Sequence, residues 1–172
     1  MENSLRRMHT DRFELMQVHN LDGWQAMLPV MREWQREGRL RYVGITTSSD
    51  RQYGEMLEIM RREPLDFIQV DYAIDERAAA DRILPLAKDS GAAVLVNMPF
   101  GRGRLFKRVA GRDLPDWAAD INVTSWAQLF LKYVVSHPAV TAAIPGTTKP
   151  HHAVDNLGAA RGALPDEPMR RR

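Results

Sequence analysis

Cysteine is absent from the 172 residues of the chain. This absence excludes disulfides and thiolate metal sites, and it fits a reducing compartment. The adjacent pair His151 and His152 does not suggest another metal centre, because neighbouring side chains at the start of a helix point in different directions. We therefore expect no metal. The first residues also lack the apolar segment of a secretory signal, so we expect a cytoplasmic location.

Long apolar runs and a strong excess of one charge are missing too. No stretch approaches the ~20 apolar residues of a membrane helix, and a net charge of +2 leaves no basic footprint for a nucleic acid. Hydrophobic residues at 44% and charged residues at 27% are typical of a globular protein. We expect neither a membrane nor a nucleic acid as partner, and we expect the arginines at 170–172 to be solvated.

Strand-like and helix-like segments alternate along the whole chain. Apolar runs predict strands at 13–18, 41–46, 66–72, 92–96 and 140–144. Helices are expected at 24–37, from 49 or 50 to 62, and at 77–90, 123–136 and 150–162, with a long loop at 97–122. Five such units predict an α/β fold with a parallel sheet and helices outside, either doubly wound or part of a barrel.

In parallel α/β proteins the functional site lies at the carboxyl ends of the strands. His19 directly follows the first expected strand, where an imidazole could donate a hydrogen bond to a reacting carbonyl. The alternative is a histidine that only caps a backbone group at the strand end. The residues after the other strands are mostly polar, which favours a site at this edge of the sheet.

The segment IPGTTKPHH leads from the last expected strand into the last expected helix. Backbone N–H groups at a helix start, the hydroxyls of Thr147 and Thr148, and the ammonium of Lys149 could together hold a phosphate. The spacing is not that of a P-loop, which requires GxxxxGK[ST]. The alternative is an ordinary turn before a helix with a lysine on the surface.

Five segments of the chain together resemble the aldo-keto reductases, the (β/α)8-barrel enzymes that reduce aldehydes and ketones with a nicotinamide cofactor. The segments are SLRRMHTDRFELMQVHN, EGRLRYVGITT, DFIQVDYAIDER, SWAQLFLKYVVSHPAVTAAIPGTTKPHHAVDN and GALPD. The resemblance implies a partial TIM barrel of five C-terminal βα units with parallel strands, starting at the helix before the fourth barrel strand. Residues 1–172 would then form a single incomplete barrel domain.

The resemblance assigns roles to residues at the ends of the strands. His19 matches the active-site histidine that orients and polarises the substrate carbonyl. Gln69 matches the glutamine that contacts the nicotinamide carboxamide, and Thr46 and Thr47 stand where the family usually has Ser-Asn for the same group. Asn97 stands where many members have a tyrosine that stacks on the nicotinamide.

The resemblance also assigns roles at the other end of the cofactor. The residues that match the family's phosphate loop are Gly146, Thr147 and Lys149. His152 falls near the usual arginine for the 2′-phosphate, whereas Asp155 and Asn156 match the adenine contacts. The resemblance therefore implies NADPH as the cofactor, with NADH as the second choice, and a small carbonyl compound as the substrate.

The family's catalytic Asp, its proton-donating Tyr and the partner Lys come from early strands that the resemblance does not cover. The four tyrosines, at positions 42, 53, 72 and 133, do not match the catalytic one. A full barrel needs ~250 residues or more. We expect a truncated oxidoreductase that is inactive alone, or alternatively a non-catalytic nicotinamide-dinucleotide-binding or interaction module. Open sheet edges would favour self-association unless a partner covers them.

Overall fold

A computed structural model describes residues 1–171; Arg172, the last residue of the expected domain, lies outside the described part. One parallel sheet contains five strands in the order of the sequence, β1-β2-β3-β4-β5. The strands are β1 (Phe13–His19), β2 (Leu40–Thr47), β3 (Phe67–Asp71), β4 (Ala93–Asn97) and β5 (Ala142–Ala143). In a doubly wound sheet the strand order reverses at a switch point. The unbroken order therefore selects consecutive units of a barrel.

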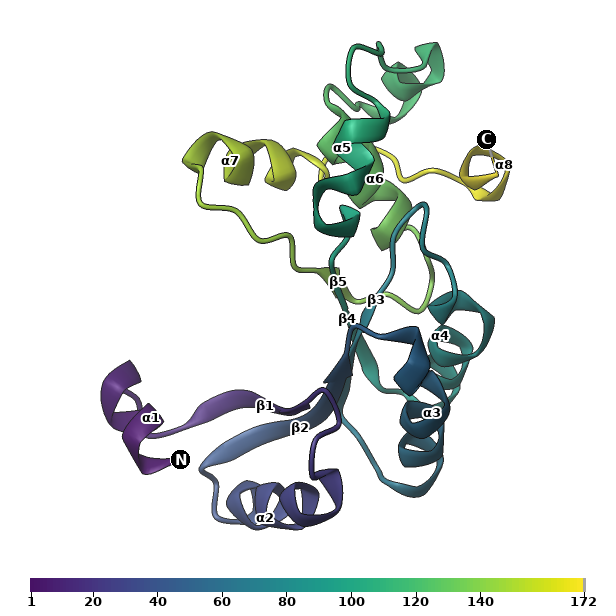
Figure 1. Cartoon of the computed structure of the whole chain (residues 1–172). Coiled ribbons are helices and arrows are strands. Elements are labelled where there is room, and N and C mark those ends of the chain that lie inside the picture. The colour runs from purple at the N-terminus through teal and green to yellow at the C-terminus, as the bar shows by residue number, and fades with distance from the viewer. Residues whose placement is uncertain (172) are drawn as a thin grey trace.

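The helices connect the strands or extend the chain beyond them. The α-helices are α1 (Glu2–Met8), α2 (Trp24–Arg36), α3 (Tyr53–Arg62), α4 (Ala79–Ser90), α5 (Arg104–Arg108), α6 (Trp126–Val135), α7 (Pro150–Gly158) and α8 (Glu167–Arg170). Three short 3-10 helices are η1 (Asp50–Gln52), η2 (Gly101–Gly103) and η3 (Asp116–Ile121). Figure 1 shows α2, α3 and α4 along one side of the curved sheet.

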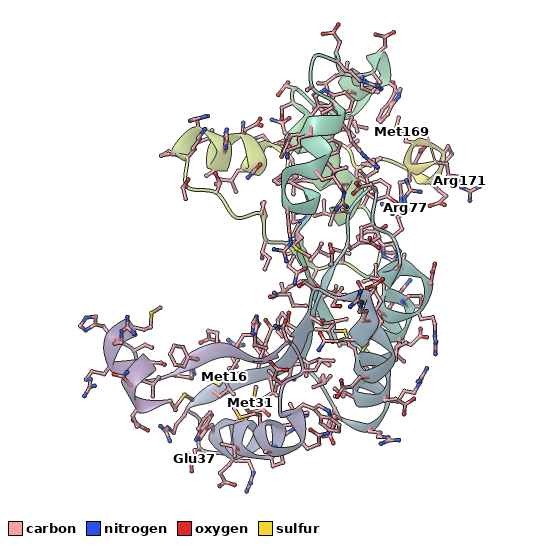
Figure 2. All side chains as sticks on the ribbon, viewed as in Figure 1. Met16, Met31, Glu37, Arg77, Met169 and Arg171 are labelled. Atoms are coloured by element: carbon pink, nitrogen blue, oxygen red, sulfur yellow. The ribbon has the colours of Figure 1, made fainter. Side chains whose placement is uncertain are left out.

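The helix-covered side of the sheet is the hydrophobic core. Val18, Ile45, Ile68 and Val94 are aligned partners across β1 to β4 and are at most 4% exposed. Because side chains alternate along a strand, the residues next to these four point to the opposite side of the sheet. Figure 2 shows the methionines at 16 and 31 between the β1–β2 ribbon and α2, where Met31 is completely buried.

Strand β2 approaches β3 closely at Gly44. A Cβ atom added there would lie 2.5 Å from the carbonyl oxygen of Phe67, which is inside the range that real Cβ atoms avoid. The glycine in the segment RYVGIT therefore allows the pairing that places the ends of the two strands side by side.

The expected long loop and the expected helix after it differ in detail from the structure. The loop contains η2, α5 and η3, and the next helix begins at Trp126 instead of at 123. Ser125 explains the later start, because its Oγ accepts a hydrogen bond from the backbone N–H of Gln128 and so caps α6. The last expected helix is also shorter, since α7 ends at Gly158.

The expectation of a solvated C-terminus is wrong for Arg170. Its side chain is only 11% exposed. Its guanidinium lies 4.3 Å from the ring centroid of Tyr133 and donates a hydrogen bond of 2.7 Å to the hydroxyl of Tyr72. These contacts attach the C-terminal segment to α6 and to the end of β3, and Figure 2 shows Met169 close to Arg77 there.

The helices of residues 1–171 are short or only partly apolar. None of them combines the length and the apolar character that crossing a bilayer would require.

Candidate functional site

Three of the expected site residues form a row at the carboxyl edge of the sheet. His19 on β1 is the aligned partner of Thr46 on β2, which in turn is the partner of Gln69 on β3. Aligned residues of parallel strands point to the same side, so these three side chains lie on the face opposite the core. His19 is exposed, Gln69 is partly buried and Thr46 is 7% exposed.

Thr47 is separated from this row. It follows Thr46 directly, so its side chain points to the helix-covered face, where the residue is completely buried. Its hydroxyl donates a hydrogen bond of 2.5 Å to Gln52 Oε1 and accepts one of 3.1 Å from the backbone N–H of Ser49. The structure therefore uses Thr47 to fix the turn after β2 and does not bring its hydroxyl to the other site residues.

Asn97 ends β4 beside Asp71, the last residue of β3 and its aligned partner. Each of these residues has one buried side-chain oxygen, Oδ1, without a hydrogen-bond partner in the part of the chain that is described. Burial raises the pKa of the Asp71 carboxyl to about 6, and the charge of Glu76 adds to this increase. The carboxyl of Asp71 therefore keeps its proton to a higher pH than an exposed aspartate would.

The second part of the site is a cleft of about 430 Å³ between the long loop, α6 and α7. One wall is aromatic, with Phe100, Phe106 and Trp126. The other wall comes from the IPGTTKPHH segment and the helix that follows it. Its lining residues are Gly146, Thr147, His152, Asp155 and Asn156.

Lys149 stands directly before α7 and is exposed. Its backbone N–H donates a 3.1 Å hydrogen bond to Thr147 Oγ1, and the same hydroxyl lies 3.5 Å from His152 Nδ1. Among the described residues, no carboxylate lies within ion-pair distance of Lys149. Thr147 and His152 line the cleft, and Lys149 stands directly before α7 between them in the sequence. A cation and two polar side chains at the positive end of a helix are suited to an anion.

Asp155 lines the cleft, but its carboxylate is bound by α6. Oδ2 accepts a 2.7 Å hydrogen bond from Ser125 Oγ, and Oδ1 accepts one of 2.7 Å from Gln128 Nε2. Both carboxylate oxygens of Asp155 are thus engaged by the protein itself. Asn156 lines the same wall of the cleft.

Sequence reasoning missed a second hollow of about 320 Å³, next to the first and sharing Phe100, Phe106 and Gly146 with it. Arg102 lines this hollow from the long loop. Its φ of 55° is rare for a residue other than glycine. The sequence signal was the run Gly101-Arg102-Gly103-Arg104, which places a basic side chain between flexible glycines. Nothing in the spacing of the aromatic residues indicated that they would share a wall.

The four tyrosines lie away from His19 or are engaged elsewhere. Tyr42 lies four residues before Thr46 on β2, packed 5.4 Å from the ring of Phe67. The hydroxyl of Tyr53 donates to the backbone carbonyl of Asp71 at 3.3 Å. Tyr72 and Tyr133 stack on each other with ring centroids 5.9 Å apart.

The raised pKa of Asp71 predicts a stability effect that depends on pH. The folded carboxyl holds its proton more tightly than the unfolded one, whose reference pKa is 3.8. Its contribution to the free energy of unfolding is therefore fully present below pH ~4 and is lost as the pH rises through about 6. Asp71→Asn, which is neutral throughout, should raise this free energy at pH 7.5 by on the order of 1 kcal/mol after solvent screening, and little at pH 4.

Urea unfolding at the two pH values measures this difference. Asp75→Asn is the matched control, because a hydrogen bond from Arg104 lowers the pKa of Asp75 and its substitution should destabilise the protein at pH 7.5. An equal effect of Asp71→Asn at both pH values would contradict the assignment.

The model of the Aldo/keto reductase family matches residues 1–171. The chain is 33% identical to aldo-keto reductase YhdN of Bacillus subtilis over 108 residues, which is 61% of this chain and 32% of that protein. It is 24% identical to the NADH-specific methylglyoxal reductase of Escherichia coli, covering 95% of this chain and 59% of the relative.

Solved structures show the same fold. The aldo/keto reductase of Klebsiella pneumoniae in complex with NADP and acetate has a TM-score of 0.80 and 26% identity, covering 98% of this chain and 60% of that one. AKR11C1 of Bacillus halodurans, in its holo form, has a TM-score of 0.78 at 23% identity, covering 99% and 62%. The chain thus spans about 60% of the length of these structures. Five parallel strands in sequence order and a family match over residues 1–171 establish that the chain belongs to the aldo/keto reductase family.

Proposed function

We propose that this chain forms the cofactor-binding side of an oxidoreductase site that reduces an aldehyde or ketone with NADPH, with NADH as the second choice. The observation that carries the proposal is the group at the start of α7. There Thr147 and His152 line the cleft of about 430 Å³, and Lys149, whose backbone N–H donates to Thr147 Oγ1, stands exposed directly before the helix. The relatives crystallised with NADP or NADPH support the choice of cofactor.

The residues present fit a dinucleotide at both of its ends. An ammonium and a helix N-terminus suit phosphate oxygens, and the aromatic wall with Trp126 suits a flat base. At the strand ends, the amide of Gln69 and the hydroxyl of Thr46 lie in one row and can bind a carboxamide. Two further amides are available: Asn97 at the strand ends and Asn156 in the cleft. When bound, the reduced nicotinamide supplies a hydride.

His19 contributes to the reaction by orienting the carbonyl. Its side chain is exposed on the open face of the sheet, so a small substrate can reach it. An imidazole N–H donates a hydrogen bond to the carbonyl oxygen and stabilises the negative charge that develops there. Thr47 has no part in this proposal as a ligand, and its hydroxyl positions the turn that follows Thr46.

A second function, cofactor binding without turnover, is favoured by the positions of the tyrosines. The proton that the product alkoxide needs must come from an acid, and in this family the acid is a tyrosine. Tyr53 donates to a backbone carbonyl, and the hydroxyls of Tyr72 and Tyr133 lie 3.5 Å apart in the interior. The chain by itself would then bind the cofactor and the carbonyl compound without an efficient proton donor.

The cytoplasmic location expected from the sequence stays a prediction.

The cofactor site is tested by Lys149→Ala. Removing the ammonium should weaken NADPH binding by about tenfold or more and NADH binding less, because only NADPH carries the extra phosphate. Titration of tryptophan fluorescence measures both dissociation constants, since Trp126 lines the cleft. Lys88→Ala, an exposed lysine on α4, is the matched control and should change neither. An equal loss for both cofactors would remove Lys149 from the phosphate site.

Turnover distinguishes the two functions. With NADPH and a generic aldehyde, the chain alone should be slower by about 10²–10⁴-fold than a relative that has its tyrosine, the range that general acid catalysis contributes. Loss of NADPH absorbance measures the rate, and cofactor binding is verified on the same sample. A rate similar to that of the complete relative would show that another group donates the proton.

The sheet edges favour self-association. Strands β1 and β5 end the sheet on its two sides in the described structure, and Ile144 beside β5 is 44% exposed. Unpaired N–H and C=O groups on such edges are sites for pairing with another chain. Sedimentation velocity of the chain alone should therefore show species larger than a monomer, and their share should grow with concentration. A single monomeric species up to high concentration would contradict this expectation.

A further inference from the structure

Asp155 is the one acidic side chain among the described residues that line the two hollows of the cleft. The resemblance to the family suggested an adenine contact for it. Its two oxygens instead accept hydrogen bonds of 2.7 Å from Ser125 Oγ and from Gln128 Nε2. A negative charge thus lies beside the ligand cleft but is directed at α6.

The partners of Asp155 are themselves fixed. Gln128 is 6% exposed, and its Oε1 accepts hydrogen bonds from the backbone N–H and the hydroxyl of Thr124, at 3.0 and 3.2 Å. The amide can therefore present only its NH₂ group to Asp155. Helix α7 also packs tightly here, because a Cβ added to Gly158 would lie 2.6 Å from Gln128 Nε2.

Helix α6 offsets the negative charge of Asp155. Ser125 is the N-cap of this helix and Gln128 lies in its first turn, so the carboxylate stands at the positive end of the helix dipole. None of the other described residues that line the cleft carries a carboxylate, and the exposed Lys149 stands directly before α7.

We propose that Asp155 is a positioning residue that also sets the choice of cofactor: Ser125 and Gln128 hold it, so that it anchors α7 on α6 and keeps its negative charge away from the ligand. The proposal rests on the proposed function. A free carboxylate in such a cleft would repel the phosphate monoester that distinguishes NADPH, and it would accept hydrogen bonds from the ribose hydroxyls of NADH. The two hydrogen bonds therefore maintain a preference for NADPH.

The other roles open to Asp155 make different predictions. A purely structural anchor, once lost, would weaken the binding of both cofactors by the same factor. A direct contact with adenine would do the same, because both cofactors contain adenine. Only a change in the ratio of the dissociation constants for NADPH and NADH would show that the position of the Asp155 charge matters.

The experiment compares Gln128→Met with Gln128→Met/Asp155→Asn. The single substitution removes one of the two donors and leaves the carboxylate held by Ser125 alone, so that one oxygen can turn toward the cleft. NADPH binding should then weaken by about tenfold more than NADH binding. In the double variant the charge is gone, and the ratio should return to the value of the unsubstituted chain. Both dissociation constants come from tryptophan fluorescence, and thermal unfolding verifies that each variant folds.

Ser125→Ala provides a second route if the Gln128 variants do not fold, because it removes the other donor to Asp155 and should change the ratio in the same direction. Equal weakening of both cofactors would overturn the proposal, as would a changed ratio that persists in the double variant. Failure of the unsubstituted chain to bind either cofactor would overturn the proposed function as well. That result is seen before any variant is made, so the two failures are distinguishable.

Discussion

The alternation of side chains along parallel, aligned strands is the constraint on which the rest of the structure depends. One set of alternate residues, including Val18, Ile45 and Ile68, is buried under the helices. The other set necessarily faces the opposite side, and it includes His19, Thr46 and Gln69. The chain needs no special device to gather its strand-end site, because the pairing register that forms the core also aligns these residues.

The sequence alone was sufficient for the parts that depend on short-range pattern. Apolar runs and helical spacing placed all the strands, and the position of His19 directly after a run indicated a site residue. Gly38 and Gly91, which follow α2 and α4, take positive φ angles that suit a helix end. Periodicity left a doubly wound sheet and a barrel as alternatives; the family resemblance favoured the barrel, and the observed strand order confirms it.

The features that could not be predicted depend on which face of the sheet a side chain occupies, and on contacts between residues that are far apart in the sequence. Thr47 differs from Thr46 by one position, yet that position reverses its face and commits its hydroxyl to Gln52. Asp155 meets Ser125 and Gln128 across 30 and 27 residues of sequence. No local pattern encodes such pairs. The family resemblance could assign Asp155 to the cofactor region, but it could not say which way its carboxylate points.

Ser125 has two roles, since the same Oγ atom accepts from the backbone N–H of Gln128 and donates to Asp155. The first turn of α6 and the wall of the cleft are consequently linked through one atom. Fraying of that turn would release α7 from α6 and open the cleft, and a ligand in the cleft would hold the turn closed. The residence time of a bound dinucleotide would then be governed partly by how often a few hydrogen bonds at the start of a helix break.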